Sequence, residues 1–266
     1  MFNTKIEIIY SDDDIIVINK PTGLSVTKDR TGLPELKNIL SKQLSSPTAK
    51  ELRLIHRLDK DTSGVMILAK NAGTQSKFTS YFQKRFVQKT YLAFVSGAVI
   101  QSEGQIDAPL ASLRKNTQRM CIDYKKGKKS ITQWKFLADF GQIALLAVKP
   151  ITGRRHQIRV HLPSIGLPLV IDPLYGSSGG LFLSSFKKGY RLRKGKTEKP
   201  LIDRLTLHAY QIEIPHTENS RPDFFVAGLD EKFSATIKML TKHNPHSIGA
   251  FTDTENFTKI TQSQRL

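Results

Sequence analysis

Cysteine is almost absent: the 266 residues include one, Cys121. A single thiol excludes a disulfide within the chain and a metal site built on paired thiolates. No activating partner is evident near Cys121, which favours a buried or incidental cysteine over a nucleophile. This use of cysteine suits a reducing compartment, so we expect a cytoplasmic protein.

Long apolar runs and targeting signals are also missing. No segment approaches the roughly eighteen consecutive apolar residues that a membrane-spanning helix needs. The first residues, MFNTKIEIIYSDDD, lack a basic region followed by an apolar run, and so do not resemble a secretory signal. We therefore expect a soluble protein with no membrane partner.

Acidic residues are scarce beside basic ones. The chain has 23 Asp and Glu against 41 Lys and Arg, a formal net charge of +18. Such an excess is typical of proteins that bind polyanions. Residues 114–129 hold seven basic residues and one acid, and residues 187–204 hold eight and two. Neither segment has an apolar period, so both predict exposed loops or hairpin tips that bind phosphates.

Nucleotide-binding and metal-binding motifs are lacking as well. The segment GYRLRKGKT differs from a Walker A loop because five bulky residues separate its glycines and no apolar strand precedes it. HRLD lacks the downstream Asn and the glycine-rich loop of a kinase. His156 and His161 have no carboxylate at zinc-ligand spacing, so the histidines are interpreted as structural or RNA-facing and no metal is expected.

Apolar periodicity predicts more strands than helices. The strands mostly follow one another directly, which favours a mixed, largely antiparallel α+β fold with peripheral helices over a doubly wound one. No repeat or linker appears, so we predict one domain at residues 1–242 and a loosely held tail at 243–266. Strands are expected in KIEIIY, IIVI, GVMILAKN, KTYLAFVSG, SITQWKFLADF, QIALLAVKP and RLTLHAYQIEIPH, and helices in LPELKNILSKQL, AGTQSKFTSYFQKRF after an Asn71 cap, TGRRHQIRVHLPSIG and LDEKFSATIKML.

The segment HRLDKDTSG (residues 56–64) places Asp59 among basic groups on a turn before a strand. An exposed ion pair is the simplest interpretation. Reactive residues, however, are often held on turns that rigid strands support. A desolvated carboxylate that stays ionised needs a cation or donors nearby, and Arg57, Arg154, Arg155 and Arg159 are candidates. If residues 155–161 form a helix, Arg155 and Arg159 lie one turn apart on one face.

HRLDKDTSGVMILAK resembles the signature of the RluA-like pseudouridine synthases, His-Arg-Leu-Asp-x-x-Thr-Ser-Gly before an apolar strand. Four other segments resemble further motifs of this family in the same order, from about residue 6 to 216. Leu167 and Ile171 depart from the third motif, where a histidine and a glycine are usual, and we expect altered packing there. The four segments are IIYSDDDIIVINKPTGLSV, FQKRFVQKTYLAFVSG, TGRRHQIRVHL with GLPLVIDPLYG, and RLTLHAYQIEIPH.

The resemblance implies the fold of the pseudouridine synthase catalytic domain and isomerisation of uridine in RNA without cofactor or metal. It implies that Asp59 is the catalytic aspartate, that Tyr91 packs against the target base and helps to take its C5 proton, and that Arg159 pairs with Asp59. Asp59 either attacks C1′ or removes the C2′ proton, and both routes stay open. The expected substrate-binding residues are His56, Arg57, Arg154, Arg155 and Ile158.

From the substrates known for this family alone, we expect ribosomal RNA as the substrate, with transfer RNA as the alternative. A non-catalytic RNA-binding protein on this fold and a glycosylase are the competing functions, and product analysis separates them. We expect a monomer. The basic insertion at residues 177–200 is a candidate for RNA recognition.

Overall fold

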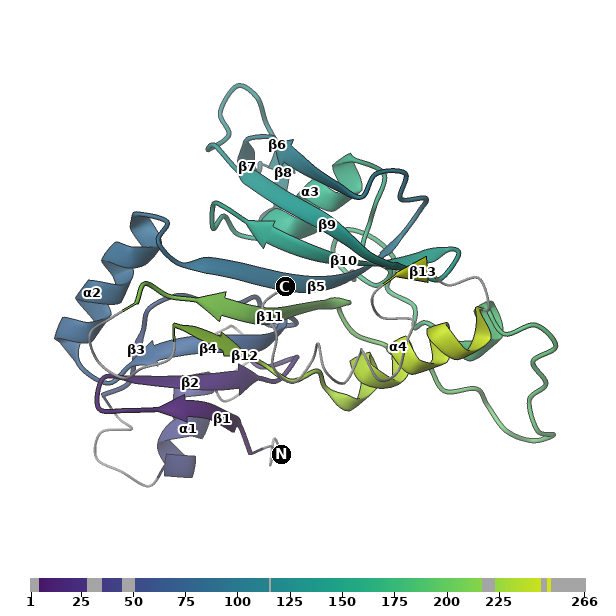
Figure 1. Ribbon diagram of the computed structural model, residues 1–266, viewed down its shortest axis with the longest axis horizontal. Helices are drawn as coiled ribbons and strands as arrows, with labels where there is room; N and C mark the ends of the chain where they lie inside the picture. Colours follow the sequence, from purple (N-terminus) through teal and green to yellow (C-terminus); the bar gives the residue numbers. More distant parts are fainter. Residues whose placement is uncertain are drawn as a thin grey trace. The chain divides into compact units, whose positions relative to one another are not determined.

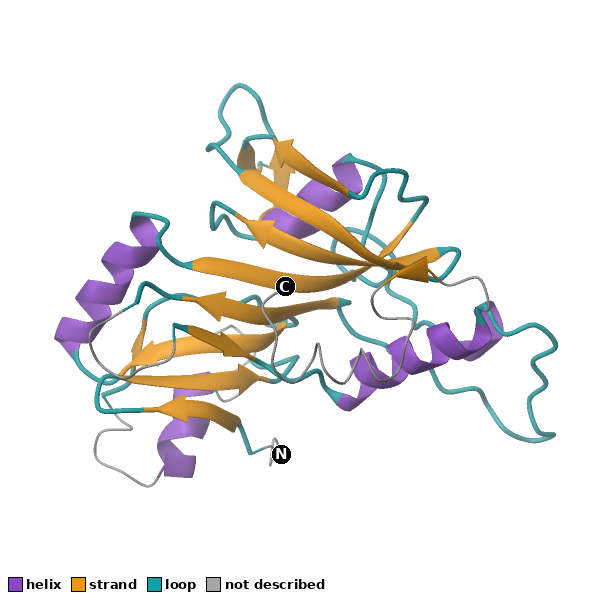
Figure 2. Ribbon diagram, in the orientation of Figure 1, coloured by secondary structure: helices purple, strands orange, loops and turns teal. Residues whose placement is uncertain are grey.

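The computed structural model describes residues 5–27, 35–44, 51–114, 116–216, 223–244 and 248–249. They belong to two compact units (Figures 1 and 2). The first unit draws on Met1–Thr90 and His208–Gly228, and the second on Tyr91–Leu207 and Leu229–Leu266. That one catalytic domain extends over residues 1–242 stays a prediction. No helix in the described segments has the length and apolar character needed to cross a membrane.

The first unit contains a sheet with the strand order β1-β2-β4-β11, to which β3 and β12 add short strands beside β4 and β11. The β4–β11 pair is parallel and the other pairs of this unit are antiparallel. Strands β2 and β4 are apolar and almost wholly buried, as expected for strands covered on both faces. The elements are β1 (Glu7–Ser11), β2 (Ile15–Lys20), α1 (Leu36–Leu44), β3 (Arg53–Leu54), β4 (Ser63–Ala69), α2 (Ala72–Gln83), β11 (Leu207–Glu213) and β12 (Phe224–Val226).

Local signals in the sequence account for several ends of these elements. The carboxylate of Asp12 accepts hydrogen bonds from the amides of Asp14 and Ile15, which forms the turn between β1 and β2. The amide oxygen of Asn71 accepts a bond of 2.8 Å from the Thr74 amide, so the predicted N-cap of α2 is confirmed. The predicted helix at 33–44 is observed over Leu36–Leu44, and its residues 33 and 34 lie outside the described ones.

The second unit has a sheet with the order β5-β10-β9-β13, in which β6 also pairs with β9, and a separate hairpin of β7 and β8. All the pairs described within it are antiparallel, and together with the first unit they confirm a mixed, largely antiparallel α+β fold. The elements are β5 (Gln88–Ser96), β6 (Glu103–Asp107), β7 (Leu110–Leu113), β8 (Asn116–Ile122), β9 (Ile131–Asp139), β10 (Ile143–Pro150), α3 (Gln157–Ser164), a 3₁₀ helix η2 (Leu183–Ser185), α4 (Glu231–His243) and β13 (Ile248–Gly249).

A buried apolar cluster joins the elements of the second unit. Leu146 and Val148 of β10, Ile158 and Leu162 of α3, and Trp134 of β9 belong to it. Helix α3 is therefore packed onto the sheet, which fixes the residues that precede and follow it. Of the predicted tail at 243–266, residues 245–247 and 250–266 lie outside the described residues.

Candidate active site

Asp59 lies in the first unit, on the turn between β3 and β4. Its carbonyl oxygen accepts a bond of 3.2 Å from the Thr62 amide, which closes the turn. Leu58 is buried, Asp59 is half-buried and Arg57 is exposed. The turn leads directly into β4, whose seven residues are all buried. Asp59 is thus held at the end of a rigid strand, as predicted.

Lys20 and Thr22, at the end of β2, hold the backbone that follows Asp59. The Lys20 side chain is fully buried, and its ammonium donates to the carbonyl oxygens of Pro21 (2.9 Å), Leu24 (2.8 Å) and Lys60 (2.9 Å). The Thr22 hydroxyl donates to the carbonyl oxygen of Asp61 at 2.7 Å. An ammonium has three donors, and three carbonyl dipoles compensate the charge that burial would otherwise penalise.

His56 supports the other side of the turn. Its ring stacks on Phe82 of α2, with centroids 4.8 Å apart, and its Nε2 accepts a bond of 3.0 Å from the Ile67 amide. Burial, and then the charge of Lys89, lower the pKa of His56 to about 3. The imidazole is therefore neutral at pH 7, and the backbone donor at Nε2 assigns its proton to Nδ1.

Lys89 is close to the same aromatic ring. Its ammonium lies 5.9 Å from the centroid of Phe82, within the range of a cation–π contact. Burial lowers the pKa of Lys89 to about 8. His56 is thus fixed between a strand and a helix, beside a partly desolvated cation.

The motif residue Ser63 forms a buried pair with His208. The Ser63 hydroxyl lies 2.9 Å from Nδ1 of His208, whose Nε2 lies 3.2 Å from the carbonyl oxygen of Ala227. Ser63 is 3% exposed and His208 0%, so this Ser–His pair is closed to substrate. It joins β4, β11 and the segment after β12, and its role is structural.

Gly64 permits the close approach of β4 and β11. Its φ is +117°, and an added Cβ would lie 2.1 Å from the carbonyl oxygen of Ala209. No other residue fits there without displacing backbone. The glycine that ends HRLDKDTSG therefore sets the position of the strand that carries the Asp59 turn.

Arg159 lies in the second unit, on α3, and is 5% exposed. Its Nε donates to Oδ2 of Asp172 at 2.8 Å and its Nη2 to Oδ1 at 2.7 Å. This bidentate geometry is the strongest form of an arginine–carboxylate pair. Oδ1 of Asp172 also accepts bonds from the amides of Leu174 and Tyr175, so the same carboxylate shapes the turn after it.

Tyr175 connects this pair to the β7–β8 hairpin. The guanidinium groups of Arg119 and Arg159 both lie over its ring, 5.2 and 5.3 Å from the ring centroid. Its hydroxyl accepts a bond of 2.6 Å from the Met120 amide and lies 2.8 Å from Nδ1 of His156. Burial raises the pKa of Tyr175, so the hydroxyl stays protonated at neutral pH.

The conditional prediction of a helix at residues 155–161 is wrong at its start. Helix α3 begins at Gln157, and His156 before it has a left-handed φ of +53°. The side chain of Gln157 accepts bonds from the Arg154 amide and the Thr152 hydroxyl, which fold the preceding segment back on the helix. Arg155 therefore does not share a helical face with Arg159.

The remaining predicted residues of the second unit have different surroundings. Tyr91 on β5 is paired in register with Val148 and packs, partly buried, against the apolar cluster. Ile158 is buried within that cluster. Arg154 and Arg155 are exposed, and Nε of Arg154 donates to the carbonyl oxygen of Lys129 at 3.3 Å.

The structure thus brings the predicted residues together in two sets. His56, Arg57 and Asp59 share one turn of the first unit, and Arg154, Arg155, Ile158 and Arg159 surround the start of α3 in the second. The observed carboxylate partner of Arg159 is Asp172, and its pairing with Asp59 stays a prediction.

Comparison with known proteins identifies the family. Residues 14–164 match the model described as RNA pseudouridylate synthase. The chain belongs to this family. The resemblance to RluA-like pseudouridine synthases is confirmed, and these enzymes are isomerases that act on RNA.

Relatives of this pseudouridine synthase match over most of its length. Ribosomal large subunit pseudouridine synthase D of Borreliella burgdorferi is 34% identical over 229 residues, which are 84% of this chain and 65% of that protein. Ribosomal large subunit pseudouridine synthase C of Buchnera aphidicola is 35% identical over 88% of this chain and 70% of its own. A solved structure of human RNA pseudouridylate synthase domain containing 4 has a TM-score of 0.65 at 29% identity and covers 88% of this chain and 92% of that one.

Three residues of this synthase that hold the two sets in place were not among the predicted site residues. Lys20, Asp172 and Tyr175 lie in KPTG and DPLYG, within segments that resemble family motifs. The sequence signal that could have identified these residues is their position within the motifs. Ile171 and Leu167, which depart from the third motif, are both buried, and the altered packing expected there stays a prediction.

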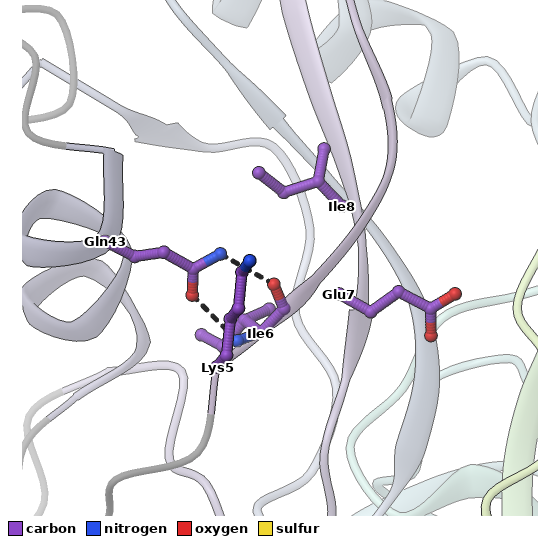
Figure 3. Close-up of a pocket in the computed structure, with 5 residues that line it drawn as sticks. All are labelled: Lys5, Ile6, Glu7, Ile8 and Gln43. Atoms are coloured by element: carbon purple, nitrogen blue, oxygen red, sulfur yellow. Dashed lines mark hydrogen bonds between the residues drawn. The ribbon is translucent and has the colours of Figure 1, made fainter.

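A pocket beside β1 does not belong to either set. Lys5, Ile6, Glu7, Ile8 and Gln43 line it, and the amide of Gln43 bonds both the amide and the carbonyl oxygen of Ile6, at 2.7 and 2.8 Å (Figure 3). Glu7 points away from Gln43 and accepts a bond from Asn19. We interpret this contact as an attachment of α1 to the sheet. In the described part of the chain, no three His, Cys, Asp or Glu side chains gather as metal ligands would.

Proposed function

We propose that this pseudouridine synthase isomerises uridine in ribosomal RNA and that Asp59 is its catalytic residue. The observation that carries the proposal is the support of the Asp59 turn. Lys20 and Thr22 hold the carbonyl oxygens of the next two residues, while the half-buried Asp59 lies between exposed Arg57 and half-buried Lys60. Reactive groups need this combination of a fixed backbone and an accessible side chain.

The reaction rearranges bonds without importing a group. The N1–C1′ bond breaks, the uracil turns, a C5–C1′ bond forms, the C5 hydrogen leaves as a proton and N1 gains a proton. Asp59 starts this sequence by attack on C1′ or by removal of the C2′ proton. Tyr91 packs against the base and helps to take the C5 proton. Arg159 pairs with Asp59, as the resemblance implies.

The other predicted residues bind the substrate in this proposal. Arg57 helps to open a place for the flipped base, because the target uridine must leave the stack to react. His56 is neutral and is held by Phe82 and the Ile67 amide, so it presents an uncharged surface to the substrate beside the turn. Ile158 contributes apolar surface, and the exposed Arg154 and Arg155 bind phosphates.

Ribosomal RNA is proposed because relatives at 34% and 35% identity are named as synthases of the large ribosomal subunit. Action as a monomer and a cytoplasmic location stay predictions. The test is tritium release from transcripts labelled at C5 of uridine. We expect release from large-subunit ribosomal RNA, and little from small-subunit ribosomal RNA or transfer RNA. Release from transfer RNA alone would overturn the choice of substrate, and release from none would overturn the function.

A further inference from the structure

A loop in the second unit lies between the Tyr175 turn and β11, and we call residues 181–202 the basic loop. An antiparallel β-bridge between Leu181 and Ile202 joins the two ends of this loop. The Leu181 amide donates to the carbonyl oxygen of Ile202, and the Leu201 amide to that of Leu181, both at 2.8 Å. Leu181 is 8% exposed and Ile202 0%, so the base of the loop is anchored in the fold.

The loop has order of its own between these ends. Hydrogen bonds connect the Lys187 amide to the carbonyl oxygen of Leu183 (2.9 Å), the Tyr190 amide to that of Lys187 (3.2 Å), and the Lys196 amide to that of Arg193 (3.0 Å). Successive turns therefore follow η2. Figure 1 shows the loop as the green trace that projects past the end of α4.

The charges of the basic loop are nearly all of one sign and face the solvent. The one acid between residues 181 and 202 is Glu198, and its carboxylate accepts a bond of 2.9 Å from the Ser184 amide. The Glu198 carboxylate therefore stabilises η2. Seven basic residues share the loop, of which Lys187 is half-buried and the others are exposed: Lys188, Arg191, Arg193, Lys194, Lys196 and Lys199.

The residues that the structure describes give no structural reason for this concentration of charge. Like charges on neighbouring turns repel one another, so the loop costs stability that a partner of opposite charge would restore. Exposed Lys and Arg on a fixed backbone suit phosphate groups, which fix the position of a nucleic acid and do not report its sequence. The half-buried Tyr190, with the Lys187 ammonium 5.9 Å from its ring centroid, adds an aromatic surface at the same place.

We propose that residues 187–199 bind the phosphate backbone of the substrate RNA, as a second contact made by residues other than those that carry the chemistry. This inference rests on the proposed function for the identity of the polyanion. The loop increases affinity for structured RNA and leaves the rate of isomerisation on saturated enzyme unchanged.

The test compares two full-length variants with the same loss of four positive charges. The loop variant replaces Arg191, Arg193, Lys194 and Lys196 by Gln. The control replaces four exposed lysines of the first unit by Gln: Lys5, Lys42, Lys77 and Lys84. The probes are a large-subunit ribosomal RNA transcript and a short RNA duplex of unrelated sequence, measured between about 50 and 200 mM salt.

We expect the loop variant to bind the transcript at least about tenfold more weakly than the wild type, with a log–log salt slope smaller by about 3, and the control to change both much less. KM for tritium release should rise with kcat retained. Replacement of Arg191 and Arg193 by Lys should preserve binding, which separates charge from folding. Equal effects of the two Gln variants, or no effect of either, would overturn the proposal.

Two further outcomes separate this inference from the proposed function. Binding by wild type without tritium release from any RNA would contradict the function and leave the loop testable by affinity alone. Unchanged RNA binding of the loop variant, together with lost binding to vesicles containing phosphatidylserine, would assign the loop to a membrane surface and overturn the inference.

Discussion

The ammonium group of Lys20 donates a hydrogen bond of 2.9 Å to the carbonyl oxygen of Lys60, the residue that follows Asp59. A lysine at the end of a buried strand thus fixes the backbone of the turn proposed to carry the chemistry. The contact relates two motifs that are forty residues apart in the chain. The stability of the turn and the activity should therefore depend on the same side chain.

Lys20→Met should lower the free energy of unfolding by about 3 kcal/mol or more, because three carbonyl groups lose a charged donor in a buried site. Thr22→Val removes one bond, to the Asp61 carbonyl, and should cost about 1 kcal/mol. Urea unfolding measures both. In tritium release at a temperature where both fold, kcat should fall more for Lys20→Met than for Thr22→Val. Wild-type stability of Lys20→Met would show that the three bonds do not support the turn.

His56 should make the protein less stable in mild acid. Its pKa is lowered to about 3 in the folded chain, mainly by burial, and is about 6.5 when the chain unfolds. The unfolded state therefore takes up the proton first, and stability is lost as pH falls from 6.5 towards 3. Between pH 7 and 5.5 the wild type should lose about 1 kcal/mol more than His56→Gln. Equal losses in the two proteins would contradict a neutral His56 with a lowered pKa.

Gly64→Ala and Gly23→Ala separate backbone strain from steric contact. Both glycines have positive φ, +117° and +76°, but an added Cβ meets the Ala209 carbonyl only at Gly64 and has open space at Gly23. Gly23→Ala should cost about 1–2 kcal/mol. Gly64→Ala should cost more than about 4 kcal/mol or prevent folding, since β4 or β11 must move. Thermal unfolding of the two variants measures this difference in stability, and similar melting temperatures would refute the steric argument.

Asp172→Asn should lower stability by about 3–5 kcal/mol, because it removes the charge of the carboxylate that the buried Arg159 binds through two hydrogen bonds. Asp203→Asn is the matched control: its partner Lys232 and Asp203 itself are half-exposed, at 50% and 48%. That change should cost less than about 1 kcal/mol. Chemical denaturation measures both, and a small effect at Asp172 would argue against a tight pair with Arg159.

Apolar periodicity and capping signals predicted much of the fold. The buried runs that became β2 and β4 and the Asn71 cap of α2 are local features, and local features determine secondary structure where tertiary contacts agree with them. The start of α3 was predicted wrongly because the left-handed His156 and the Gln157 side-chain bonds interrupt an otherwise helical pattern.

The supports of the candidate site were harder to predict. A lysine is rarely fully buried, so nothing in the residue type indicated that Lys20 would point inward. The Arg159–Asp172 pair depends on a turn between α3 and Tyr175 that has no periodicity. Contacts between segments distant in the chain carry these arrangements, and only the resemblance to family motifs pointed to the residues involved.

The most direct test of the account is tritium release from a large-subunit ribosomal RNA transcript labelled at C5 of uridine, for the wild type, Asp59→Asn and Asp61→Asn. The neighbouring Asp61 is a matched control, because its carbonyl oxygen, which Thr22 binds, is kept in the variant. We predict that Asp59→Asn lowers kcat at least about a thousandfold with RNA affinity preserved, and that Asp61→Asn remains active. Wild-type release by Asp59→Asn would contradict the assignment of Asp59.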